Sequence, residues 1–402
     1  MVLKNDYKYI AVETVFPFFG IIYSIKNKAV KSFPLIFALF FFFFGTQIII
    51  TDSNDIGRYL QVFSDLSNYD NISFWGYFYS MNEGNQIDYY LPFMTWLISR
   101  FTSNSQLFAG ILAMLMGLCY GFNFSYIVKR LENTNLLSLV LLFLLFLIPH
   151  SFFCTHRWWM ALQVFLLGAL PYVLDGKNKY VLFSILSIFI HFSFLYPLVL
   201  LLVYRFLPRR SLLLFVVLFF LTNFIDALNI NTIAKMFEQY LPDAYAARNE
   251  SYINAEFLEH NWFSQSYKLI WKYVNILLVL YIYLNRKALL GDDSRLRDLF
   301  VISLLIGSFV AITAMTEWGG RYFDLSNFLF CCLYVLILSK QPNVGGSFNK
   351  VITILSPFLV FNILFQIRGI FVVIGVKTLL FGNVFTTWII EESTSILELL
   401  KG

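Results

Sequence analysis

Residues 152–206 read FFCTHRWWMALQVFLLGALPYVLDGKNKYVLFSILSIFIHFSFLYPLVLLLVYRF. His156 and Arg157 open the first long apolar run of this stretch, and His191 interrupts the second. Ionisable side chains are costly inside a lipid bilayer, so those that do occur there are functional candidates by default. The stretch therefore predicts membrane helices that carry candidate functional residues.

The composition of the whole chain points to the same class. Of the 402 residues, 59% are hydrophobic and only 13% are charged, whereas a soluble domain has roughly 25% charged residues. Many apolar runs approach the ~20 residues that a membrane helix needs, and runs such as 136–148 lack the polar–apolar alternation of a β-barrel. We expect an all-α polytopic integral membrane protein with about 10–12 transmembrane or re-entrant helices.

The charged and cysteine residues exclude several function classes. Lys and Arg do not cluster with aromatic residues on a polar segment, so we expect no nucleic-acid partner. The four cysteines lie in or beside apolar runs, where cysteine is usually a small buried hydrophobe. Neither a Cys-x-x-Cys nor a His-Glu-x-x-His spacing occurs, and we expect neither a metal nor another cofactor.

The charges of the loops predict the topology. The apolar run 10–25 is expected to be a retained first span, because no small-residue cleavage site follows it. Short basic loops then fall on one side of a single threading, near Lys26, Lys129, Lys177, Arg205, Arg286 and Lys340. We expect one membrane domain over 1–402, with two polar segments on the outer face: 52–103, which includes a surface helix, and 226–266. The segment 369–402 is left unplaced.

The second apolar run of the opening stretch, residues 180–204, allows two interpretations. It is long enough for one span. However, Lys177 and Lys179 precede it and Arg205 follows it, so the positive-inside rule places both of its ends in the cytoplasm. We favour two half-helices that enter the membrane and return, with His191 near the tip.

Arginines on the expected outer face are candidates for binding a phosphate group. The guanidinium is always charged and presents a planar set of donors that matches phosphate oxygens. Alternatively, each arginine reaches lipid headgroups or closes a surface ion pair. That alternative is weaker for Arg157 and Arg321, which stand beside aromatic residues at the starts of apolar runs. The outer-face arginines are Arg58, Arg157, Arg248, Arg321 and Arg368.

Carboxylates on the same face are candidates for a general base. Transfer of a group to a hydroxyl needs a residue that takes the hydroxyl proton. Asp55 ranks first because it shares a helical turn with Arg58 and Tyr59, and Glu317 ranks second. For Asp55, Asp88 and Glu317, ordinary solvation stays the alternative. His191 is either a neutral core histidine or a group that accepts or donates a proton.

An ordered set of motifs resembles a known family. The motifs are Asp55-Ile-Gly-Arg-Tyr59, Tyr90-Leu-Pro-Phe93, Arg157 with Ala161, Asp175-Gly-Lys-Asn-Lys179, His191-Phe-Ser193 and Arg321-Tyr322. Over about residues 30 to 340 the chain is similar to the EpsG-like branch of the Wzy-type bacterial polysaccharide polymerases. This resemblance implies a fold similar to lipid-dependent, GT-C-like glycosyltransferases that work without a metal.

The resemblance also implies an activity: joining undecaprenyl-pyrophosphate-linked repeat units into an O-antigen, capsule or exopolysaccharide. The protein would lie in the bacterial inner (plasma) membrane with its site facing the periplasm or outer face, in contact with membrane lipid and with a chain-length regulator protein as a further partner. A flippase for lipid-linked sugars and a membrane acyltransferase stay as alternatives. The residues assigned to pyrophosphate or substrate binding are Arg58, Tyr59, His156, Arg157, Arg321, Tyr322 and Arg368, and those assigned to catalysis are Asp55, Glu317 and His191.

Overall fold

A computed structural model of the chain describes residues 7–49, 55–67, 72–80, 88–147, 156–207, 211–224, 262–313, 321–341 and 346–401. Every regular element in these ranges is a helix. The side chains of Asp55 and of residues 262–265 lie outside the description, as does most of the predicted outer segment 226–266. The described elements confirm the all-α class.

Six helices are long and apolar enough to cross a membrane. They are α7 (Ser105–Val128), α9 (His156–Asp175), α15 (Trp262–Leu284), α17 (Ser294–Thr313), α18 (Tyr322–Ser339) and α19 (Ser347–Val373). Shorter apolar helices accompany them: α3 (Phe33–Thr46), α8 (Leu136–Leu147), α10 (Val181–Ile190), α11 (Leu195–Val203) and α12 (Leu212–Phe224). Long and short apolar helices together confirm a polytopic membrane protein.

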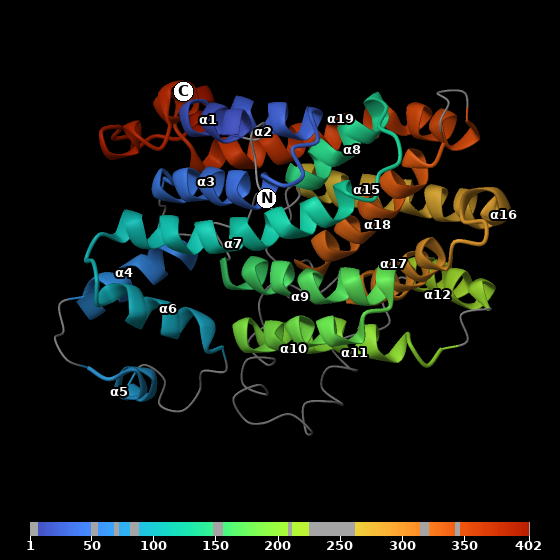
Figure 1. The fold of residues 1–402 in the computed structure, drawn as a ribbon, viewed down its shortest axis with the longest axis horizontal. Helices are drawn as coiled ribbons and strands as arrows, with labels where there is room; N and C mark the ends of the chain where they lie inside the picture. The colour runs from blue at the N-terminus through green and yellow to red at the C-terminus, as the bar shows by residue number, and fades with distance from the viewer. Residues whose placement is uncertain are drawn as a thin grey trace.

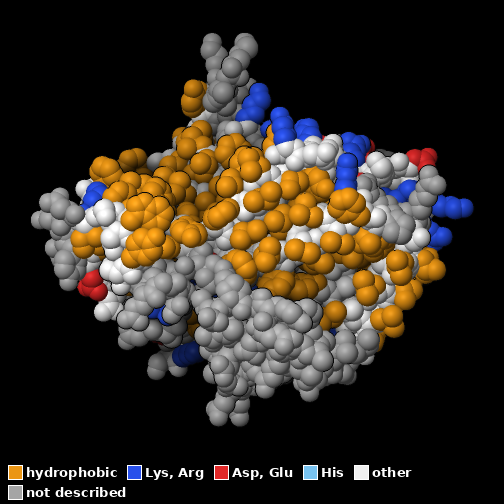
Figure 2. All heavy atoms as spheres, turned by 90° about the horizontal axis from the view of Figure 1, so that it is seen from below, with side chains coloured by type: hydrophobic (Ala, Val, Ile, Leu, Met, Phe, Trp, Pro, Cys, Tyr) orange, Lys and Arg blue, Asp and Glu red, His pale blue; other side chains and the backbone are white. Residues whose placement is uncertain are grey.

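Most of the long helices lie roughly along the longest axis of the molecule, and α18 crosses it obliquely (Figure 1). Their basic turns meet at one end, which we call the basic end. There Arg130, just after α7, donates to Asp175 at 2.7 Å, and Lys340 pairs with Asp293. Figure 2 shows hydrophobic side chains across the middle of one face and most Lys and Arg toward the right, the side on which α16 (Arg286–Leu289) lies. This distribution is typical of a protein whose middle lies in lipid.

Close contact between α3 and α7 forms one core of the bundle. A side chain at Gly121 would bring its Cβ within 2.6 Å of the Phe33 carbonyl oxygen, so only glycine fits there. Phenylalanines of α3 then pack against aromatic residues of α7; the Phe37 and Tyr120 rings, for example, are 5.1 Å apart. Several of the many phenylalanines in the chain thus pack helix against helix.

The first apolar run differs from the predicted single span. It forms α1 (Tyr7–Val15) and α2 (Pro17–Lys26), and the chain bends at Phe16. Proline restricts the residue before it to extended conformations, which ends the preceding helix. The bend is sharp enough to bring Gly20 against Glu13, whose side chain is buried.

The predicted break at His191 is present. The helix α10 ends at this residue, and the 3-10 helix η3 (Phe192–Phe194) connects it to α11. Both outer ends of the pair lie near the C-terminal end of α9: Lys177 N–H donates to the Pro171 carbonyl at 3.2 Å, and the Tyr204 ring is 5.9 Å from that of Tyr172. The two half-helices therefore form a hairpin with its tip at residues 191–194. Figure 1 shows both of them beneath α9.

The opposite end of the bundle, which we call the site end, carries the segment after α3. It contains α4 (Asp55–Ser67), α5 (Phe74–Ser80) and α6 (Tyr90–Ser99), at the left of Figure 1. The predicted surface helix corresponds to α4, and its apolar face packs against α6 and α7, with the Phe63 ring stacked 4.2 Å from that of Phe108. This packing positions Tyr59, which belongs to the candidate site.

The C-terminal segment, unplaced by the sequence, also packs at the site end. It contains α20 (Val376–Phe381), the 3-10 helix η5 (Thr386–Trp388) and α21 (Ile396–Lys401). Gln47, just after α3, donates to the Thr387 carbonyl at 2.6 Å. Glu392 accepts hydrogen bonds from the N–H groups of Lys377 and Thr378. These contacts fold the tail back onto the helix bundle.

Candidate functional site

Arg157 is held at the start of α9 by two other segments. Its Nε donates to Tyr59 Oη on α4 at 3.0 Å, and its Nη1 donates to Asp88 Oδ2 at 3.0 Å. The guanidinium also lies 5.4 Å from the Tyr59 ring centre, within range of a cation–π interaction. These contacts anchor the guanidinium. The group is still accessible, because 17% of the Arg157 side chain is exposed.

Asp88 joins this arginine to the hairpin. Its side chain is only 2% exposed, and its Oδ1 accepts the Phe192 N–H at 3.0 Å. A buried carboxylate is tolerated when it is paired and hydrogen-bonded, and Asp88 satisfies both conditions. One side chain therefore fixes the start of α9 and the tip of the hairpin relative to each other.

The hairpin tip in turn contacts the start of α18. His191 Nδ1 accepts the Ser193 N–H at 3.3 Å and lies 2.8 Å from Ser193 Oγ. The Ser193 carbonyl accepts a hydrogen bond from Tyr322 Oη at 2.6 Å. Tyr322 is the first residue of α18 and follows Arg321 directly. The two arginine motifs, distant in the sequence, are thus connected through residues 191–193.

The hairpin tip lies next to two helix N-termini and two arginine-containing motifs. The N-termini of α9 and α18 both contact the tip, and each helix N-terminus carries a partial positive charge and N–H groups that suit an anion. Arg157 and the partly exposed Arg321 add full charges. Donors of these kinds suit an anionic group with several oxygen acceptors.

Other predicted residues have supporting or more distant positions. His156 is 2% exposed, and its Nε2 lies 3.2 Å from Tyr90 Oη. Its ring is therefore buried and contacts α6. Arg58 is exposed on α4, 5.9 Å from the Tyr59 ring, and Arg368 is exposed on α19. The hydrogen-bonded connection from Arg157 to Tyr322 runs through Asp88 and the hairpin tip, and both of these arginines stand outside it.

The two predicted bases are not located by the structure. Asp55 is the first residue of α4, but its side chain lies outside the description, and Glu317 falls within 314–320, outside the described residues. Their assignment stays a prediction. Within the described ranges, no cluster of three or more His, Cys, Asp or Glu side chains could hold a metal ion.

The structure gives two carboxylates positions that the sequence did not predict. Asp88 was one of several carboxylates predicted on the outer face, and nothing in its own sequence neighbourhood distinguished it. Asp324 lies in the first turn of α18, three positions after Arg321, and the positive charge of Lys268 on α15 attracts it. The i, i+3 spacing of Arg321 and Asp324 was the only sequence signal for a pair of charges on one helix face.

The fold and the site define a class: a polytopic α-helical membrane protein with an arginine-containing polar site at one end of its bundle. The model of the EpsG family matches residues 30–378, most of the chain. The protein therefore belongs to the EpsG family, which is associated with polysaccharide-polymerase activity of the glycosyltransferase type. Comparisons with curated proteins and with solved structures found no match.

Proposed function

We propose that this protein joins undecaprenyl-pyrophosphate-linked oligosaccharide repeat units into a surface polysaccharide. The main support is the connection, through the hairpin tip, between Arg157 at the start of α9 and the Arg321–Tyr322 motif at the start of α18. A pyrophosphate leaving group needs several cationic donors at one place. Family membership supports the class of reaction.

In this mechanism the bond between the anomeric carbon of the donor and the pyrophosphate oxygen breaks, and the leaving group keeps the electron pair. Arg157 and Arg321, with the two helix N-termini, stabilise the negative charge that develops on that oxygen. The acceptor sugar hydroxyl forms the new glycosidic bond. Its proton passes to a carboxylate, for which Asp55 is the first candidate and Glu317 the second.

His191 and Asp88 have positioning roles in this proposal. His191 caps η3 and holds Ser193, whose carbonyl receives the Tyr322 hydroxyl. Asp88 fixes the orientation of the Arg157 guanidinium. We place the site on the outer face of the bacterial inner membrane, because the basic turns collect at the opposite end. A chain-length regulator protein is a proposed partner at that face.

The test compares strains that carry Arg157→Ala or Arg321→Ala with a strain that carries Arg286→Ala. Arg286 is an exposed arginine at the basic end and serves as the matched control. The proposal expects each site variant to lose the long-chain ladder on a glycan gel and to retain the single-unit product, while the control keeps the ladder. Loss of all surface glycan would favour flipping, and a normal ladder without acetyl groups would favour acylation.

A further inference from the structure

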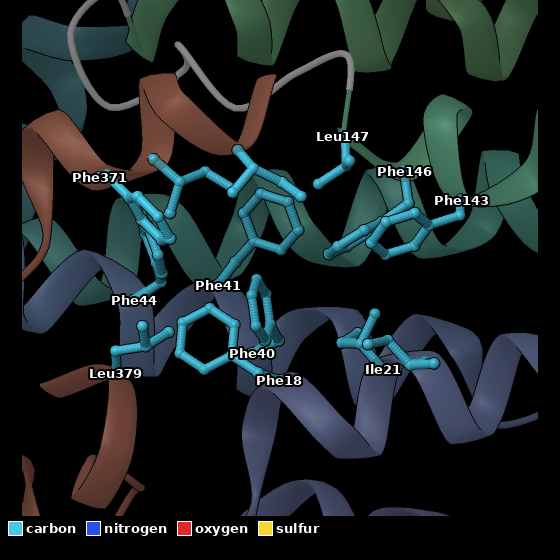
Figure 3. A pocket seen from close by; sticks show the side chains of 13 residues that line it. Phe18, Ile21, Phe40, Phe41, Phe44, Phe143, Phe146, Leu147, Phe371 and Leu379 are labelled. Atoms are coloured by element: carbon cyan, nitrogen blue, oxygen red, sulfur yellow. The ribbon is translucent and has the colours of Figure 1, made fainter. Parts of the chain in front are cut away.

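A second feature of the molecule is a cavity of about 230 Å³ among α2, α3, α8, α19 and α20 (Figure 3). The 13 side chains that line it are all Phe, Ile or Leu. The rings of Phe40, Phe41 and Phe44 from α3 and of Phe371 from α19 surround its centre in Figure 3. Such a cavity binds hydrocarbon, because it offers no hydrogen-bond partner to water.

The cavity lies toward the site end of the bundle. Phe44 is near the C-terminus of α3, and Leu147 is the last residue of α8. The next helix, α9, begins nine positions after Leu147, at His156, and carries Arg157 in its first turn. Since these nine positions span at most about 30 Å, a flexible chain of moderate length can reach from the arginine to the cavity.

The cavity also borders the surface that faces lipid. Ile22, which lines it, is 49% exposed, and Leu380, adjacent to the lining residue Leu379, is 63% exposed. An apolar cavity of about 150 Å³ accommodates a six-carbon ring, so by proportion this one takes about nine carbon atoms, close to two isoprene units. A hydrocarbon chain can therefore enter from the bilayer and fill it.

We propose that this cavity binds isoprene units of the polyprenyl tail of the lipid-linked substrate, an inference that rests on the proposed function. The lining is rich in phenylalanine, whose rings offer broad apolar faces to the methyl branches and flat double bonds of such a chain. The tail of a substrate whose pyrophosphate contacts the arginines is favoured over the acyl chains of the surrounding lipids, because its two contacts belong to one molecule.

The expected selectivity is moderate. A tail that leaves the bilayer moves from one hydrocarbon environment to another, so the hydrophobic effect contributes little. The gain comes from the contacts that fill an otherwise empty space. Binding is strengthened where the pyrophosphate contacts the arginines at the same time, because the two contacts belong to one molecule.

The test uses the full-length protein in lipid nanodiscs with a polyprenyl pyrophosphate that carries a photoreactive diazirine in its tail. Cross-linked peptides are mapped by mass spectrometry. Labelling is expected on the cavity walls of α8 and α19. Leu379→Trp, which fills the cavity, should lower labelling about fivefold. Leu380→Trp places the same side chain one position away on the exposed surface and should leave labelling unchanged.

Three outcomes would overturn the inference: labelling spread evenly over the lipid-facing helices, labelling unaffected by Leu379→Trp, or equal labelling by a phosphatidylglycerol with a diazirine in its acyl chain. Cross-linking needs no polymerisation, so this result is separate from the glycan gel. If Arg157→Ala abolishes the ladder but the cavity walls are not labelled, the proposed tail site is wrong and the polymerase proposal stands. If the cavity is labelled and the ladder survives Arg157→Ala, the polymerase proposal fails.

Discussion

Removal of Asp88 gives the sharpest test of the site geometry. Asp88→Ala deletes the acceptor of Arg157 Nη1 and of the Phe192 N–H. Breaking a buried ion pair from one side typically costs 3–5 kcal/mol. Because the Arg157 side chain keeps 17% exposure to solvent, we expect the lower end, about 3 kcal/mol of unfolding free energy.

A double-mutant cycle separates this ion pair from the other roles of Asp88. The variants are Asp88→Ala, Arg157→Ala and the double variant, each unfolded reversibly in mixed lipid–detergent micelles. We expect a coupling energy of about 2 kcal/mol between the two positions. Asp65→Ala, which removes an exposed carboxylate on α4, is the control and should change stability by less than about 0.5 kcal/mol. Additive effects of the two site substitutions would refute the described pairing.

Three further predictions concern other parts of the structure. Tyr322→Phe removes the hydroxyl that donates to Ser193 and should lower stability by about 1 kcal/mol and shorten the glycan ladder; an unchanged ladder would show that this bond is dispensable. Gly121→Val places a branched side chain against the Phe33 backbone, so we expect at least about 3 kcal/mol of destabilisation, measured as lost folded yield on fluorescence-detected size exclusion. Burial alone raises the pKa of Asp293, but the hydrogen bonds from its lysine and arginine partners outweigh burial and lower that pKa to about 2. The stabilising contribution of Asp293 is therefore complete above the ordinary pKa of 3.8 and is lost as the pH falls toward 2. In the Asp293→Asn variant the melting temperature should depend less on pH between these two values than in the unmodified protein.

Local sequence was enough to predict much of the fold. Apolar length identified the long helices, and basic residues on both sides of 180–204 identified the hairpin, because loop charge reports topology. The bend at Phe16 was not predicted, although Pro17 marked it. There, the length of the apolar run carried more weight than the restriction that proline places on the preceding residue.

The site was only partly predictable. Arg157, Arg321 and His191 stood out because ionisable residues beside apolar runs are rare. The role of Asp88 could not be read from the sequence, since its partners lie 69 and 104 positions away along the chain. Contacts over such separations depend on how the helices pack, which no local pattern encodes.

The hairpin of α10 and α11 has a consequence for the membrane topology of the chain. Since it leaves from and returns to the same end, it adds no net crossing, and the helices on either side keep their orientation whether or not it is present. A fluorescent reporter inserted after Lys179 and one inserted after Arg205 would therefore report the same compartment. The hairpin thus supplies the tip residues of the site without setting the orientation of the other helices.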